Sequence, residues 1–328
     1  MAIIKLRSPR YETINTPTGA VSAKLELSID STLRYTIIKS CTGGQDVVFE
    51  ISELCRDYLT VTADNNIPQP DNYISISRTI TFYSLANGNG SVVAGGNTVT
   101  HTGGDGYGKY KDGVNPKINT AQVFLITPDY AGSGNYKVYA PVGEDGTFYY
   151  LNSSGVITNY EFDSSETSVT QRGQTITIER LDCSKYTPTR VLFLNKWGVI
   201  QELYFQTKSV ESINTNKDEF QKDLMDFSTA NTPTYDSKKH NVKIFNKQGK
   251  KTITLSSGYY PEWTNQWFEE MLMSEYVWIY KRNYSGSFKI FPVNIATSSF
   301  TKKTQLNDRL IEYTIEFEEA FDHINNIR

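Results

Sequence analysis

Cysteine is scarce in this chain, which has only three in 328 residues. Cys41, Cys55 and Cys183 are odd in number and far apart. This spacing excludes a dense disulfide scaffold and a Cys-x-x-Cys metal knuckle. We therefore expect reduced, buried thiols.

The chain also lacks long apolar runs and an excess of either charge. No stretch approaches the ~20 apolar residues of a membrane-spanning helix, and the first ten residues lack the apolar segment of a secretory signal. We predict no membrane insertion and synthesis in the cytoplasm. Lys and Arg number 33 against 36 Asp and Glu, which leaves a formal charge of −3 and no overall basic field to hold DNA.

Motifs of catalytic and metal chemistry are missing as well. The sequence contains no Gly-x-Ser-x-Gly elbow, no His-Glu-x-x-His and no Cys-His signature. His101, His240 and His323 have no second ligand at metal spacing, so we expect surface histidines. We predict that the chain is not an enzyme and holds no cofactor or metal. A pair of carboxylates acting as a glycosidase is the enzymatic alternative.

What is abundant is aromatic and β-branched sequence. Aromatics make up 13% of the chain, with 22 Tyr and 16 Phe, and such residues suit pleated, half-buried surfaces. Alternating apolar residues predict a hairpin at 25–37, a long strand at 73–83 and several short strands between 123 and 205. Helical spacing predicts helices at 51–59, with Ser52 as the cap, and at 261–274. The predicted fold class is mainly β to α+β, with antiparallel sheets or sandwiches and short helices.

We predict a division into two parts. A β-rich N-terminal region covers residues 1–222, a linker without apolar periodicity covers 223–239, and an α+β domain covers 240–328. In that domain we expect a turn at 246–249 between two strands and a closing hairpin around 306–309.

A Gly-rich segment at 86–116 interrupts the N-terminal region and holds few residues that could form a core. We expect a loop that projects from a sheet and orders only against a partner, because fixing glycine backbone costs about 1–2 kcal/mol per residue. Tyr107 and Tyr110 are its candidate contact residues. A phosphate cradle and a calcium-binding repeat are alternatives, but the first needs a strand before and a helix after, and the second needs several copies.

The helix predicted at 261–274 has a stripe of large apolar side chains on one side. The stripe either packs over the sheet of its own domain or faces a neighbouring subunit, and we favour the core interpretation. Its residues are Trp263, Trp267, Phe268, Met271 and Leu272.

The last predicted strand alternates apolar and acidic residues. Glu312, Glu316 and Glu318 share the side opposite to Ile311, Tyr313, Ile315 and Phe317. The carboxylates form either a solvated face, compensated by Lys302 and Lys303, or the negative lumen of a ring through which a polyanion slides.

Several stretches together resemble structural proteins of tailed bacteriophages, particularly uncharacterised virion proteins of phages that infect Bacteroidetes-type and marine bacteria. The stretches are Val-Phe-Glu-Ile-Ser-Glu-Leu-Cys-Arg-Asp-Tyr-Leu at 48–59, Gly-Tyr-Gly-Lys-Tyr-Lys-Asp-Gly-Val-Asn-Pro at 106–116, Val-Leu-Phe-Leu-Asn-Lys-Trp-Gly-Val at 191–199, Ser-Glu-Tyr-Val-Trp at 274–278, Pro-Val-Asn-Ile at 292–295 and the segment 306–321. The C-terminal strand-helix-strand order is similar to the β-sandwich of tail-tube proteins.

The resemblance implies a virion component of the tail tip or baseplate, similar to distal tail proteins. Its implied partners are copies of itself in a closed three- or six-fold ring, other tail or connector proteins, and genomic DNA in transient passage. A neck or collar adaptor and a receptor- or glycan-binding module of the tail are the alternatives. The fold analogy alone carries little information about function.

Overall fold

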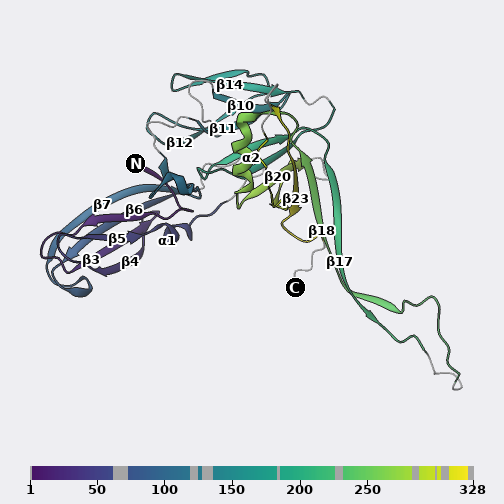
Figure 1. The fold of residues 1–328 in the computed structure, drawn as a ribbon, viewed down its shortest axis with the longest axis horizontal. Coiled ribbons are helices and arrows are strands. Elements are labelled where there is room, and N and C mark those ends of the chain that lie inside the picture. Colours follow the sequence, from purple (N-terminus) through teal and green to yellow (C-terminus); the bar gives the residue numbers. More distant parts are fainter. Residues whose placement is uncertain are drawn as a thin grey trace.

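Figure 1 shows the fold as a computed structural model. The structure describes residues 2–61, 73–118, 125–127, 136–182, 185–225, 232–282, 288–299, 301–303 and 310–323. Strands dominate and helices are short, which confirms the predicted fold class. Cys183 and the closing hairpin predicted at 306–309 lie outside the described residues. No helix in the described part of the chain is long and apolar enough to cross a membrane.

The N-terminal lobe is built on a six-stranded sheet of order β4-β3-β6-β7-β1-β8. A two-stranded ladder of β2 and β5 and the short helix α1 share its core. The hairpin predicted at 25–37 is confirmed by the antiparallel pairing of β3 with β4, and Leu25, Leu27 and Ile29 are buried on one side of it. The elements are β1 (Ala2–Lys5), β2 (Tyr11–Asn15), β3 (Ser22–Ile29), β4 (Thr32–Ser40), β5 (Asp46–Glu50), α1 (Ser52–Arg56), β6 (Tyr73–Tyr83), β7 (Val92–Gly104) and β8 (Lys117–Ile118), with 3-10 turns η1 (Ala86–Gly88) and η2 (Tyr110–Asp112).

The prediction that 86–116 projects from a sheet as a loop is wrong, because its middle is strand β7. β7 pairs antiparallel with β6 and, through residues 101–104, parallel with β1, so it lies inside the sheet. A Cβ atom on Gly103 would lie 2.6 Å from Ile76 Cδ1, and one on Gly104 would lie 2.4 Å from Tyr73 Cε1. Glycine is needed there because neighbouring side chains fill the space that its own would occupy.

Two three-stranded sheets follow in the chain. One has the order β12-β11-β9 and the other β10-β14-β13, and their aromatic and β-branched side chains form a common core. The strands are β9 (Leu125–Thr127), β10 (Tyr136–Pro141), β11 (Gly146–Leu151), β12 (Ile157–Phe162), β13 (Ser168–Gln171) and β14 (Gln174–Leu181). The strands predicted in this region are therefore present.

The largest sheet has seven strands in the order β16-β15-β20-β21-β23-β18-β17, and every pair in it is antiparallel. Helix α2 packs on one face of this sheet and helps to form the largest core cluster. The elements are β15 (Thr189–Leu194), β16 (Ile200–Phe205), β17 (Val210–Gln221), β18 (Val242–Ser256), β19 (Tyr260–Pro261), η3 (Glu262–Thr264), α2 (Asn265–Leu272), β20 (Val277–Arg282), β21 (Phe288–Ile295), β22 (Leu310–Ile311) and β23 (Thr314–Glu319). β19 pairs with β22 in a separate small ladder.

The structure does not divide at the linker predicted for 223–239. Strands from both sides of this segment belong to the same seven-stranded sheet, so 1–222 and 240–328 are not separate domains. The segment instead joins β17 to β18 at the end of a long hairpin, which Figure 1 shows extending away from the rest of the molecule. The turn predicted at 246–249 is also wrong, because β18 continues through it with a bulge opposite Asp218 and Glu219.

Candidate functional site

The apolar stripe of α2 lies in the core of the seven-stranded sheet. Trp267 is 2% exposed, Phe268 and Met271 are fully buried, and Leu272 is half-buried. Trp263 is 40% exposed, and its ring stands edge-on to that of Trp267 with the centroids 5.1 Å apart. The structure thus places most of this helix in its own core, with Trp263 at the rim.

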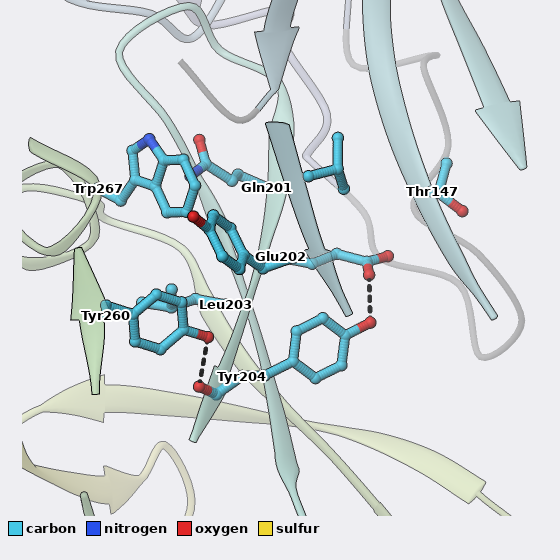
Figure 2. A pocket seen from close by; sticks show the side chains of 9 residues that line it. Thr147, Gln201, Glu202, Leu203, Tyr204, Tyr260 and Trp267 are labelled. Carbon is cyan, nitrogen blue, oxygen red and sulfur yellow. Dashed lines mark hydrogen bonds between the residues drawn. The ribbon is translucent and has the colours of Figure 1, made fainter. Parts of the chain in front are cut away.

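A small cavity lies where α2 and β16 meet the strands β10 and β11 (Figure 2). Tyr204 donates a hydrogen bond to Glu202 at 2.8 Å, and Tyr260 donates one to the backbone oxygen of Tyr204 at 2.8 Å. The cavity volume is about 10 Å³. That is room for about one water molecule, so the cavity is a packed junction and not a ligand pocket.

A buried ion pair stabilises the same junction. Arg190 donates to Glu202, and both side chains are largely covered. Burial alone would lower the pKa of Arg190, but the charge of Glu202 outweighs it and raises this pKa. Burial and Glu202 raise the pKa of Tyr204 far above its usual range. Arg190 therefore stays charged and Tyr204 stays protonated at neutral pH, which suits a structural network better than proton transfer.

The three candidate acidic residues lie on one side of the chain at β22–β23, as their alternation predicts. Glu316 is exposed, and Glu312 and Glu318 are half-buried, while the apolar residues of opposite parity are buried. Lys250 on β18 pairs with Glu318 at 2.5 Å, and Ser256 donates to Glu312 at 2.7 Å. A solvated face and a ring lumen both fit this arrangement, so the choice between them stays a prediction.

The compensation predicted for that face is wrong in its residues. Lys302 pairs with Glu269 on α2 at 2.5 Å, and Lys303 donates through Nζ to the backbone oxygen of Glu312. Neither lysine forms an ion pair with the three carboxylates among the described residues. Cross-strand pairing explains the difference, because Thr252 on β18 lies opposite Glu318 and thereby brings Lys250 close to it.

The two tyrosines proposed as a contact loop have different environments. Tyr110 is fully exposed in η2, whereas Tyr107 is half-buried with the Arg7 guanidinium 5.3 Å from its ring centroid. The backbone around Tyr107 is fixed by a hydrogen bond of 3.0 Å to the Lys196 oxygen. Tyr110 is therefore the more accessible of the two candidate contact residues.

A lysine-rich depression of about 570 Å³ lies beside this segment. It is lined by Lys5, Lys109, Lys111 and Lys196, together with Trp197, Asp112, Asn115, Pro116 and Gln266. Lys109 pairs with Glu269 at 2.6 Å, and Lys196 lies 3.5 Å from Glu270. Burial would raise the pKa of Glu269, but Lys109 and Lys302 lower it. Lys109 and Lys196 are thus compensated by carboxylates of α2, and the pair of Lys109 with Glu269 joins the N-terminal lobe to this helix.

His101 is buried, against the prediction of a surface histidine, whereas His240 and His323 are exposed. His101 Nε2 lies 3.4 Å from Glu12, which also accepts hydrogen bonds from Arg10 at 2.8 Å and Arg78 at 2.9 Å. Burial would raise the pKa of Glu12, but His101, Arg10 and Arg78 lower it to about 2. The cluster joins β2 to β6 and β7.

The cysteines and the cap of α1 are structural details of the same lobe. Cys55 is a buried free thiol, and Cys41 is half-buried and free. Burial raises the pKa of Cys55 to about 12, which makes the thiol unreactive. Ser52 is not the cap of α1, because the helix already includes it and its hydroxyl donates to Glu50.

No group of three His, Cys, Asp or Glu side chains in the described ranges could hold a metal.

The most prominent exposed feature is the β17–β18 hairpin, hereafter the arm. All 12 residues of β17 are exposed, and β17 is an edge strand of the seven-stranded sheet. Phe220 and Phe245 face each other on the arm with ring centroids 6.1 Å apart, and they are 45% and 67% exposed. Sequence reasoning missed β17, because a strand with solvent on both sides shows no apolar alternation.

Comparison of the chain with protein-family models, with curated proteins and with solved structures finds no match.

Proposed function

We propose that this chain is a structural component of a tailed-phage virion, and that it forms a ring at the tail tip or baseplate together with other tail proteins. The support from the sequence is the resemblance of several stretches to phage structural proteins. The support from the fold is the arm, which is shaped to contact something outside its own chain. The proposed role is non-enzymatic.

The arm is the observation that carries the assembly part of this proposal. Its base is anchored in the body, because β18 pairs with β23 through residues 252–256. Lys250 and Gly249 also contact the body, through the Glu318 carboxylate and through a hydrogen bond of 2.7 Å from the His323 N–H to the Gly249 oxygen. Beyond Gly249 the described residues of β17 and β18 pair with each other, and their apolar side chains are exposed. An exposed edge strand and exposed aromatics favour aggregation unless a specific partner covers them. A subunit of a larger assembly supplies such a partner.

Two measurements test this function. Light scattering and negative-stain electron microscopy of the purified chain should show a closed oligomer, and a chain that stays monomeric at every concentration would contradict the proposal. Gold-labelled antibodies against the chain should bind virions of the encoding phage at the tail end. Label at the neck would favour the collar-adaptor alternative, label on peripheral fibres would favour the receptor-binding alternative, and unlabelled virions would rule out a surface-accessible virion component.

A further inference from the structure

A second exposed apolar surface lies at the other end of the molecule, at the turn between β6 and β7. We call it the turn patch and define it as Ile38, Leu85 and Val92, which are 44%, 59% and 58% exposed. Val92 pairs with Tyr83 at the end of the hairpin, and Ile38 Cδ1 lies 3.2 Å from the position of a Cβ on Gly88 in η1. The 3-10 turn η1, which follows Leu85, contacts β3, β4 and β6, so the three residues lie along the end of the sheet at the β6–β7 turn.

Leu85 and Val92 of the turn patch belong to an uncharged stretch of chain, whereas Ile38 lies on β4 opposite Lys24 of β3. Between Arg78 and Asp105 the sequence contains no Asp, Glu, Lys or Arg. Soluble surfaces usually intersperse charges of both signs, and an exposed apolar area without charge marks an interaction site. The β6–β7 turn can therefore be covered without removing any charged side chain of its own from water.

The matching surface on the arm is the arm patch, which consists of the neighbouring rings of Phe220 and Phe245, both exposed. Figure 1 shows the sheet of β3, β4, β6 and β7 at one end of the long axis and the outer arm at the other. The opposite end of β7 pairs with β1 next to the rest of the body, so the β6–β7 turn points away from it. The two patches thus lie at opposite ends of one chain.

We propose that the arm patch of one copy packs on the turn patch of the next copy. This inference rests on the proposed function and specifies how neighbouring subunits meet. A head-to-tail contact buries both apolar surfaces in every copy and can close into a ring.

The charges on the arm favour this partner over a second arm. Lys243 lies directly opposite Phe220 on the hairpin, and Lys222 is two residues beyond Phe220. In a two-fold contact between arms these lysines would approach their own copies, and like charges that face each other cost free energy. At the turn patch, Leu85 and Val92 lie in an uncharged stretch, and Lys24, which lies opposite Ile38, is already paired with Glu26 at 2.9 Å. An arm-to-arm contact would also leave the turn patch exposed in every copy.

The test uses two double variants of the full chain. The arm variant carries Phe220→Asp and Phe245→Asp, and the turn variant carries Leu85→Asp and Val92→Asp. All four residues are exposed, so each variant should keep its circular dichroism spectrum and melting temperature within a few degrees of wild type. Tyr110→Asp, at an exposed aromatic outside both patches, is the matched control and should assemble like wild type.

Sedimentation velocity gives the decisive result. Each variant alone should be monomeric, and an equimolar mixture should form a 1:1 dimer, because the turn variant has an intact arm and the arm variant an intact turn patch. A turn variant that still self-associates, a mixture that stays monomeric, or a control that also dissociates would overturn the head-to-tail contact. If the wild-type chain forms rings but the variants give one of these results, only the head-to-tail contact is contradicted. If the wild-type chain is itself monomeric, both the contact and the proposed function are contradicted.

Discussion

The molecule contains two long hairpins that use the same local structure in opposite ways. The β6–β7 hairpin contributes Ile74, Ile76, Ile80 and Phe82 to the core of the N-terminal lobe, and its neighbours in the sheet are β3 and β1. The β17–β18 hairpin exposes nearly all its outer residues and carries several charges. The Gly-rich sequence belongs to the packed hairpin and the charged sequence to the projecting one. At Gly103 and Gly104, glycine allows close approach of neighbouring side chains to β7.

A matched pair of isoleucine truncations should give the largest difference in stability between the two hairpins. Ile80 on β6 is fully buried, whereas Ile213 on β17 is 51% exposed. Ile80→Ala should lower the free energy of unfolding by about 2–5 kcal/mol, the usual cost of removing a buried isoleucine side chain. Ile213→Ala should change it by about 0.5 kcal/mol or less. Urea unfolding followed by circular dichroism measures both, and equal losses would mean that the arm is packed in solution.

Much of the fold can be predicted from one-sided burial, and the failures have a common cause. Leu25, Leu27 and Ile29, like the stripe of α2, alternate because one face meets the core and the other meets solvent. β17 has solvent on both faces, so the signal is absent. β7 has almost no large side chains of its own in its packed part, because Leu6, Ile76 and Tyr73 supply the contacts around its glycines.

The candidate site residues were also predictable only where one-sided burial leaves a pattern in the sequence. The apolar stripe containing Trp267 could be predicted because its residues recur at helical spacing. The pairing of Lys250 with Glu318 could not be predicted, because it depends on the register between β18 and β23. The arm and turn patches also depend on which surfaces stay uncovered, and a single sequence does not encode that in any local pattern.

Charged groups that contact the packed hairpin should also contribute more to stability than charged groups on the arm. Glu12 is buried against Arg78 and His101 of the β6–β7 hairpin, whereas Glu219 of the arm is exposed and pairs with Lys217. Since the pKa of Glu12 is about 2 in the folded chain against 4.5 for a free side chain, ionised Glu12 stabilises the fold. This shift corresponds to about 3 kcal/mol. The stability is fully present above pH 4.5 and is lost as the pH falls from there through 2.

Glu12→Gln should remove most of that pH dependence and lower the stability at pH 7 by about 3 kcal/mol, because Arg10 and Arg78 lose a buried partner. Glu219→Gln should leave stability within about 0.5 kcal/mol of wild type, since surface pairs contribute little. Thermal melts at pH values between 2.5 and 7 measure both variants. A Glu12→Gln protein with an unchanged pH profile would show that this carboxylate is not paired in solution.

Two glycines, one just after β7 and one in the arm, should give the smallest difference in stability. Gly106 follows β7 and packs against the turn at 196–198, where an added Cβ would lie 2.6 Å from the Lys196 oxygen and 2.9 Å from the Trp197 carbonyl carbon. Both are backbone atoms, so the turn itself would have to move, and Gly106→Ala should cost about 1–3 kcal/mol. Gly249 lies in the arm strand β18, and its added Cβ would lie 3.6 Å from Ile213 Cγ2 and 3.7 Å from both the Asn214 oxygen and His323 Cβ, which are ordinary contacts. Gly249→Ala should therefore be neutral or stabilise by about 0.5 kcal/mol, because alanine restricts the unfolded chain. Neither glycine has a positive φ, so the difference isolates packing from backbone strain. If the two substitutions change the urea midpoint equally, the close contact between the segment after β7 and the turn at 196–198 does not persist in solution.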